Sequence, residues 1–186
     1  MVIVMIKVIA FDLVGVLVRE KDFPLNEIET KIERLFGPNK NDEEFLNNIK
    51  ENIYDVSRDE IIKIIEGIIQ SIYDTKLSLE ELSEFKKVYH NIQLVVATNH
   101  VSFIQDFILS TFPNVFDKIY ISANMNKIKP DKEFYLHILK DLNISEDELL
   151  FLDDSIKNVQ GAKECGITTI RITKETNILE EIKRYI

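Results

Sequence analysis

The sequence predicts an α/β fold in which a block of helices interrupts a parallel sheet after its first strand. From residue 91 onward, short apolar runs alternate with helical patterns, which is typical of βαβ units. Residues 19–90 show consecutive helical patterns without an obvious strand, and the apolar run at 8–11 stands alone before them. We therefore expect an α/β core domain from residues 1–18 and 91–186, with a helical domain at 19–90 inserted into it.

Composition limits the classes of function. The 186 residues are 45% hydrophobic and 30% charged, without a repeat or a low-complexity tract, which fits one compact core. The net charge of −9 argues against nucleic acids and anionic membranes as partners. Cys165 is the single cysteine, which excludes an intrachain disulfide and favours a reducing cytoplasm. Lys7 and Asp12 interrupt the apolar first eighteen residues, so we expect neither a signal peptide nor a membrane anchor.

The first strand is expected at residues 8–11, which are apolar without alternation, as in a strand buried on both faces. Gly15 then marks a turn and residues 19–24 a polar connector. Four helices are expected next. The first ends at Gly37-Pro38 and the second begins near Asn41. The third and fourth open with capping boxes, which are Ser57 with Glu60 and Ser78 with Glu81.

The rest of the chain is expected to alternate strands with helices. The expected strands are residues 94–97, 118–121, 149–152 and 168–172. The expected helices are residues 101–109, 132–142, 156–165 and 177–185. Ser145 and Glu148 also match a capping box, but a strand follows them directly, so no helix is expected there.

Polar residues follow several of these strands. Asp12 comes after the first strand, Thr98 after the second, and Asp153 and Asp154 after the fourth, while Lys129 lies in the loop after the third. Because the carboxyl ends of parallel strands share one edge of a sheet, these side chains are expected to meet. Buried carboxylates without partners are costly. A hard cation such as Mg²⁺ resolves their repulsion, since it binds carboxylates together with water and phosphate oxygens.

Four motifs in this order resemble those of the haloacid dehalogenase superfamily, and in particular its small-cap members that are similar to sugar-phosphate phosphatases. The matching segments are Asp12-Leu-Val-Gly-Val16, Thr98, Lys129-Pro-Asp131, and Asp153-Asp-Ser-Ile-Lys-Asn158 followed by Gly161-Ala162. The resemblance implies a Rossmann-like sheet with strand order 3-2-1-4-5, and a four-helix cap formed by the insertion.

The resemblance also implies roles for these residues. Asp12 would attack a phosphoryl group and form an aspartyl-phosphate, which water hydrolyses. Thr98, Asn99 and Lys129 would bind the phosphoryl group, helped by backbone amides at a helix start near Asn99 and His100.

The implied cofactor is Mg²⁺. Its ligands would be Asp12, Asp154 and the main-chain carbonyl of Val14, with Asp153 behind them or acting through water. The implied substrate is a small phosphorylated metabolite. The sequence does not indicate an oligomeric state.

Val14 departs from the family pattern, because most phosphatases of this superfamily carry an aspartate there that protonates the leaving group. Three alternatives follow. The protein is a phosphatase with an activated leaving group or another acid, a 2-haloacid dehalogenase, or an inactive relative that binds or regulates. The intact pair Asp153-Asp154 argues against the dehalogenase, which needs no metal. His100 is the first candidate for a substitute acid, although the sequence favours a solvated histidine at a helix start over that role.

Overall fold

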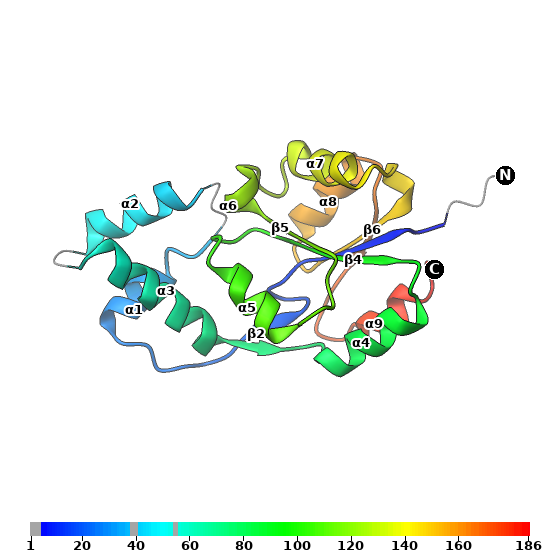
Figure 1. The fold of residues 1–186 in the computed structure, drawn as a ribbon. Coiled ribbons are helices and arrows are strands. Elements are labelled where there is room, and N and C mark those ends of the chain that lie inside the picture. The colour runs from blue at the N-terminus through cyan, green and yellow to red at the C-terminus, as the bar shows by residue number, and fades with distance from the viewer. Residues whose placement is uncertain (1–4, 38–40, 54–55) are drawn as a thin grey trace.

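The computed structural model describes residues 5–37, 41–53 and 56–186 (Figure 1). Within them a parallel sheet has the order β5-β4-β1-β6-β7. Its strands are β1 (Val8–Phe11), β4 (Gln93–Thr98), β5 (Lys118–Ile121), β6 (Leu149–Asp153) and β7 (Thr168–Arg171). Numbered along the chain, these strands lie in the order 3-2-1-4-5, which confirms the α/β prediction. β1 is central because it pairs with both β4 and β6.

Helices cover both faces of the sheet, which explains why β1 is apolar throughout. Ile9 and Phe11 pack into a core shared with α5 (Ile104–Thr111) and α9 (Ile178–Ile182). Val8 and Ala10 point to the opposite face and pack into a second core with α7 (Lys132–Leu142) and α8 (Ile156–Glu164). Figure 1 shows these two layers on either side of the strands.

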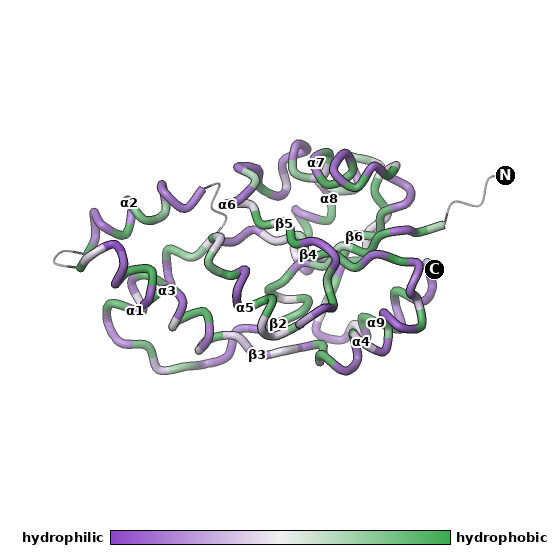
Figure 2. The backbone as a smooth tube through the Cα atoms, in the orientation of Figure 1, coloured by the Kyte–Doolittle hydropathy of each residue, from purple (hydrophilic) through white to green (hydrophobic). Residues whose placement is uncertain are grey.

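Three helices stand together at one end of the molecule (Figure 1). They are α1 (Glu27–Glu33), α2 (Asp42–Asn52) and α3 (Arg58–Ile72). Side chains of Asn26, Asn41 and Ser57 cap them by accepting backbone N–H bonds, which confirms the two predicted starts. The predicted stop at Pro38 lies outside the described residues. Hydrophobic and hydrophilic residues alternate along α3 in Figure 2, as expected for a helix with one buried face.

The fourth helix of the insertion differs from the expectation of a four-helix cap. α4 (Leu79–Val88) begins after Ser78 as predicted, but it lies on the face of the sheet that α5 and α9 cover (Figure 1). Lys86 Nζ there donates to the carbonyl of Val115 at 2.6 Å. Three helices, rather than four, therefore stand apart from the sheet in the described residues.

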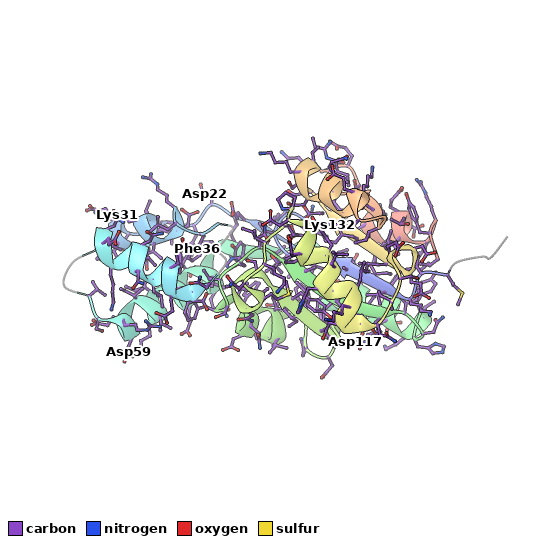
Figure 3. All side chains as sticks on the ribbon, turned by 90° about the horizontal axis from the view of Figure 1, so that it is seen from above. Asp22, Lys31, Phe36, Asp59, Asp117 and Lys132 are labelled. Carbon is purple, nitrogen blue, oxygen red and sulfur yellow. The ribbon has the colours of Figure 1, made fainter. Side chains whose placement is uncertain are left out.

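A two-stranded antiparallel ribbon joins the helical end to the sheet and was not predicted. It consists of β2 (Val18–Glu20) and β3 (Tyr73–Thr75). Its strands are three residues long and mostly polar, so they carry no apolar period that a sequence pattern could reveal. Figure 3 shows the two halves that it joins, with Lys31 and Asp59 at the helical end and Asp117 in the sheet half.

Smaller differences concern short elements. α5 begins at Ile104 rather than near residue 101, and the four-residue helix α6 (Ser122–Met125) was not predicted. Ser145 and Glu148 do form a capping box, which closes the 3-10 turn η1 (Glu146–Glu148) just before β6. In the described part of the chain, every helix is too short or too polar to cross a membrane.

Candidate active site at the strand ends

Asp12 extends β1 by one residue, since its backbone N–H still bonds to the carbonyl of Leu152 at 2.9 Å. The chain then turns tightly, and Gly15 adopts a φ of 88°, a left-handed value that favours glycine. A Cβ at Gly15 would also lie only 2.5 Å from Cγ of Asp154. The glycine of the first motif thus makes room for a carboxylate of the fourth.

Lys129 lies at the centre of the site. Its Nζ is 2.8 Å from Asp12 Oδ1 and 2.7 Å from Asp153 Oδ2, and it donates to the carbonyl of Ala97 at 2.8 Å. The Lys129 side chain is completely buried. Burial opposes its charged form, but Asp12 and Asp153 outweigh burial and raise the pKa of Lys129.

Asn99 holds the backbone of Lys129 in place. Its Nδ2 donates to the carbonyl of Lys129 and its Oδ1 accepts from the N–H of Lys129, both at 2.8 Å. The side chain of Asn99 thus positions Lys129. The predicted contact of the Asn99 backbone amide with a phosphoryl group stays a prediction.

Two carboxylates lie at the end of β6, Asp153 as its last residue and Asp154 just after it, and they differ in their surroundings. Asp153 is fully buried and accepts from Lys129, from the backbone N–H of Ser155 at 2.9 Å, and from Asn158 Nδ2 at 3.1 Å. Asp154 is exposed, and burial of part of the group together with Asp153 raises its pKa. Asp12, Asp153 and Asp154 each place one oxygen within 4.8 Å of the others.

The electrostatics of Asp12 follow from this crowding. Burial raises its pKa to about 7, with Lys129 opposing the rise and Asp153 adding to it. Three carboxylates around one ammonium leave excess negative charge, which a divalent cation would offset. Both bonds described for Asp12 fall on Oδ1, from Lys129 and from the N–H of Leu13. Its Oδ2 accepts no hydrogen bond from a described residue and is available to react.

Thr98 and Val14 lie where the motifs place them. Thr98 ends β4 and is 2% exposed, and its hydroxyl bonds to no side chain or backbone group of the described residues. Val14 is partly buried against the hydrophobic core and bridges to Val18. No proton carrier stands at position 14, as the sequence shows.

His100 does not fit the predicted role of substitute acid. Its Nε2 is 3.0 Å from the hydroxyl of Tyr73, and its ring packs at 5.6 Å from that of Phe36. Burial lowers its pKa to about 4, so the ring is neutral at pH 7. Its contacts with Tyr73 and Phe36 join the ribbon and the helical end to the sheet. The predicted helix start near this residue is also wrong, because α5 begins at Ile104 and the N–H of His100 donates to Ser122 Oγ.

Lys76 is a site residue that the sequence did not reveal. It follows β3, and its Nζ donates to the carbonyl of Gly15 at 2.6 Å, inside the turn that follows Asp12. It also opposes the rise in the pKa of Asp154. No motif marks Lys76, because only the unpredicted ribbon brings it to this turn.

Comparisons with known proteins show what this chain is similar to. A family model described as haloacid dehalogenase-like hydrolase matches residues 9–172. Sesquiterpene phosphatase astK of Aspergillus oryzae is 34% identical over 73 residues, or 39% of this chain and 37% of that protein. D-ribitol-5-phosphate phosphatase of Bacteroides thetaiotaomicron is 34% identical over 55 residues, or 30% of this chain and 27% of that protein. The matches thus span well under half the length of these two curated relatives.

Solved structures resemble the whole chain. A HAD-family enzyme of Bacteroides thetaiotaomicron, in complex with magnesium and inorganic phosphate, has a TM-score of 0.72 at 23% sequence identity. The likeness covers 93% of this chain and 97% of the other. At this identity the likeness shows the shared fold.

Proposed function

This chain belongs to the haloacid dehalogenase-like hydrolases, and from that premise we propose that it is a Mg²⁺-dependent phosphatase of small phosphorylated metabolites. The observation that carries the proposal is the buried contact of Lys129 with Asp12, which orients one oxygen of Asp12 and leaves the other available. Two relatives named as phosphatases, sesquiterpene phosphatase astK and D-ribitol-5-phosphate phosphatase, support the reaction class.

In the proposed reaction, Oδ2 of Asp12 attacks phosphorus as the bond to the leaving oxygen breaks. The covalent aspartyl-phosphate is then hydrolysed by water, which releases inorganic phosphate and restores Asp12. Lys129 offsets the charge of the transferring group, and the Thr98 hydroxyl donates to a phosphoryl oxygen. Asn99 acts indirectly, through the backbone of Lys129 that it holds.

The residues present fit Mg²⁺. Three carboxylates gather within 4.8 Å, and the missing side chain of Gly15 leaves space for Asp154. Asp12, Asp154 and the main-chain carbonyl of Val14 would hold the ion, which supplies positive charge that stabilises the phosphoryl group. Asp153 would not bind the ion directly, because its oxygens already accept hydrogen bonds from Lys129, Ser155 and Asn158.

We further propose that the inserted helices act as a cap over the site. The predicted cap covers residues 19–90, but α4 lies on the sheet, so the capping part is the helical end, residues 27–72. The β2–β3 ribbon would be its connection, and it carries Lys76 to the turn after Asp12. For location we propose the cytoplasm, where the lone Cys165 would stay reduced.

Val14 favours one alternative, which is a relative that binds a phosphorylated ligand without turning it over. Phosphate release from a panel of sugar phosphates, acyl phosphates and nucleotides, with and without Mg²⁺, separates the two functions. We expect release that depends on Mg²⁺ and disappears in Asp12→Asn. Folded protein that releases no phosphate from any member would contradict the phosphatase.

Replacing Val14 with aspartate tests the missing proton carrier. General acid–base help contributes roughly 10²- to 10⁴-fold, so we expect Val14→Asp to raise kcat by about tenfold or more. Val14→Asn, which matches aspartate in size but has no titratable proton, is the matched control and should not raise kcat. Equal rates in wild type and Val14→Asp would show that another group already supplies the proton.

The missing proton carrier also predicts slow hydrolysis of the intermediate. Rapid quenching of the wild type during turnover of an acyl phosphate should therefore trap phosphorylated protein. Val14→Asp should trap less of it, since its aspartate activates water. Continued turnover with no phosphorylated protein at any time would exclude accumulation of the intermediate.

A further inference from the structure

A cavity of about 660 Å³ opens beside the candidate active site. Gly15 and Asp154 are among the residues that line it, so the cavity borders the turn after Asp12. Its volume lies within the range of small-molecule sites, roughly 300–1,000 Å³. The cavity lies on the side of β1 that carries β6 and β7, whereas α3 packs against α5 on the other side.

Four cationic side chains line this cavity, and they come from three separate segments. They are Arg19 on β2, Lys76 after β3, and Arg171 and Lys174 at the end of β7 and beyond it. The chain as a whole has 32 acidic and 23 basic residues. The local excess of positive charge in the cavity is therefore opposite in sign to the net charge of the protein. Glu20 is the carboxylate that joins Asp154 on the wall.

The partners of these cations separate them into two pairs. Arg19 forms an exposed ion pair with Asp74 at 3.0 Å, and Lys76 donates to the carbonyl of Gly15. Arg171 and Lys174 are exposed and form no ion pair or side-chain hydrogen bond with any described residue. Two unpaired cations on the wall of a cavity are available to an anion inside it, and the arginine fork suits phosphate oxygens.

Resting on the phosphatase function above, we propose that Arg171 and Lys174 bind a second phosphate group of the substrate. The substrate class is then a sugar or polyol that carries two phosphates. One phosphate would lie at Asp12 and the other between Arg171 and Lys174, with the carbon chain in the cavity. Glu20 is available there to accept hydrogen bonds from hydroxyl groups. The second phosphate would contribute binding rather than chemistry, so its effect falls on KM.

Matched pairs of probes test this substrate class. The pairs are glucose 6-phosphate with glucose 1,6-bisphosphate, and fructose 6-phosphate with fructose 1,6-bisphosphate, all at one excess concentration of Mg²⁺. For at least one pair we expect kcat/KM of wild type to be tenfold or more higher for the bisphosphate, through a lower KM. In Arg171→Gln/Lys174→Gln this preference should fall at least tenfold.

Lys140→Gln/Lys163→Gln is the matched control. It removes the same charge from the last turns of α7 and α8, and it should keep the preference of wild type. Turnover of monophosphates without a bisphosphate preference, or a preference that survives Arg171→Gln/Lys174→Gln, would overturn the inference and leave the phosphatase function intact.

Binding without turnover provides the independent readout. Calorimetry on Asp12→Asn should show tighter binding of the bisphosphate than of its monophosphate, and the Arg171→Gln/Lys174→Gln changes should remove the difference. If wild type released no phosphate from any probe, this binding result would still support the proposed phosphate site in the cavity and would contradict the phosphatase function. Equal binding of both probes in each pair would contradict the proposal that Arg171 and Lys174 bind a second phosphate.

Discussion

The charges of individual residues explain how the site holds together. Lys129 is completely buried with three acceptors, which are two carboxylates and a carbonyl, at 2.7–2.8 Å. A buried charge is tolerated only with such partners. Lys129 therefore has two roles, because the contact that orients Asp12 also stabilises the fold.

The first prediction concerns this lysine. Lys129→Met leaves Asp12 and Asp153 buried without their cation, which should lower the free energy of unfolding by about 3–5 kcal/mol. Urea denaturation measures the loss. Lys132→Ala, which removes an exposed charge three residues later, should change the stability by less than about 0.5 kcal/mol. A Lys129→Met protein as stable as wild type would show that the ion pairs of Lys129 with Asp12 and Asp153 do not stabilise the fold.

The second prediction concerns His100 and pH. Its pKa is lowered from 6.5 to about 4 in the folded state, so the unfolded state binds more protons between these values. The stabilising contribution is complete above pH 6.5 and is lost as pH falls towards 4. Wild type should therefore lose about 2 kcal/mol more than His100→Gln between pH 7 and pH 5. Denaturation curves at both pH values measure the difference, and parallel losses would contradict it.

Among the elements, two helices contain a glycine, and the surroundings of the two glycines differ. Gly161 lies in α8, and a Cβ there would meet the carbonyl oxygen of Pro130 at 2.6 Å. The helix therefore packs closely on the loop that carries Lys129. Gly67 lies in α3, and a Cβ there would meet no atom within 4 Å.

The third prediction follows from this contrast. Gly161→Ala should destabilise the protein by about 1–3 kcal/mol because α8 or the loop must move, and it should lower kcat because Lys129 moves with the loop. Gly67→Ala should stabilise by about 0.5–1 kcal/mol through helix propensity. Thermal denaturation and activity measure both. A neutral Gly161→Ala would show that the close approach carries no strain.

The elements also show what the sequence could predict. Long apolar periods and side-chain caps are local signals, so the sheet strands and the starts of α2, α3 and α4 were predicted correctly. The packing of α4 against the sheet was not predicted, because an amphipathic face does not specify which core it packs on. The ribbon of β2 and β3 was missed because its short polar strands have no apolar periodicity.

The same distinction applies to the site. The strand ends placed Asp12, Asp153 and Lys129 at one edge, because parallel topology alone brings them together. The role of the Asn99 side chain was missed, since a strand-end amide does not show that it will bond to a peptide 30 residues later. Lys76 was missed because it reaches Gly15 only through the ribbon.

At the scale of the whole molecule, one hydrophobic core links the two halves. The same cluster contains Ile32, Phe45 and Ile61 of the helical end and Ile9 and Phe11 of β1. Side-chain contacts cross between the halves as well, since Asp42 Oδ1 accepts from the N–H of Ser102 at 2.9 Å. Unfolding the helices would expose apolar surface on the sheet, so the two halves stabilise each other.

The fourth prediction is that the helical end and the sheet unfold together. Because their core is shared, hydrogen exchange should give peptides from α3 and from β1 the same free energy of opening, as in a two-state protein. Tyr73→Phe removes the hydroxyl that contacts His100 and should lower both values equally, by about 1 kcal/mol. If α3 opened at a free energy several kcal/mol below that of β1, the helices would be an independently folding unit. The shared core would then not couple them to the sheet.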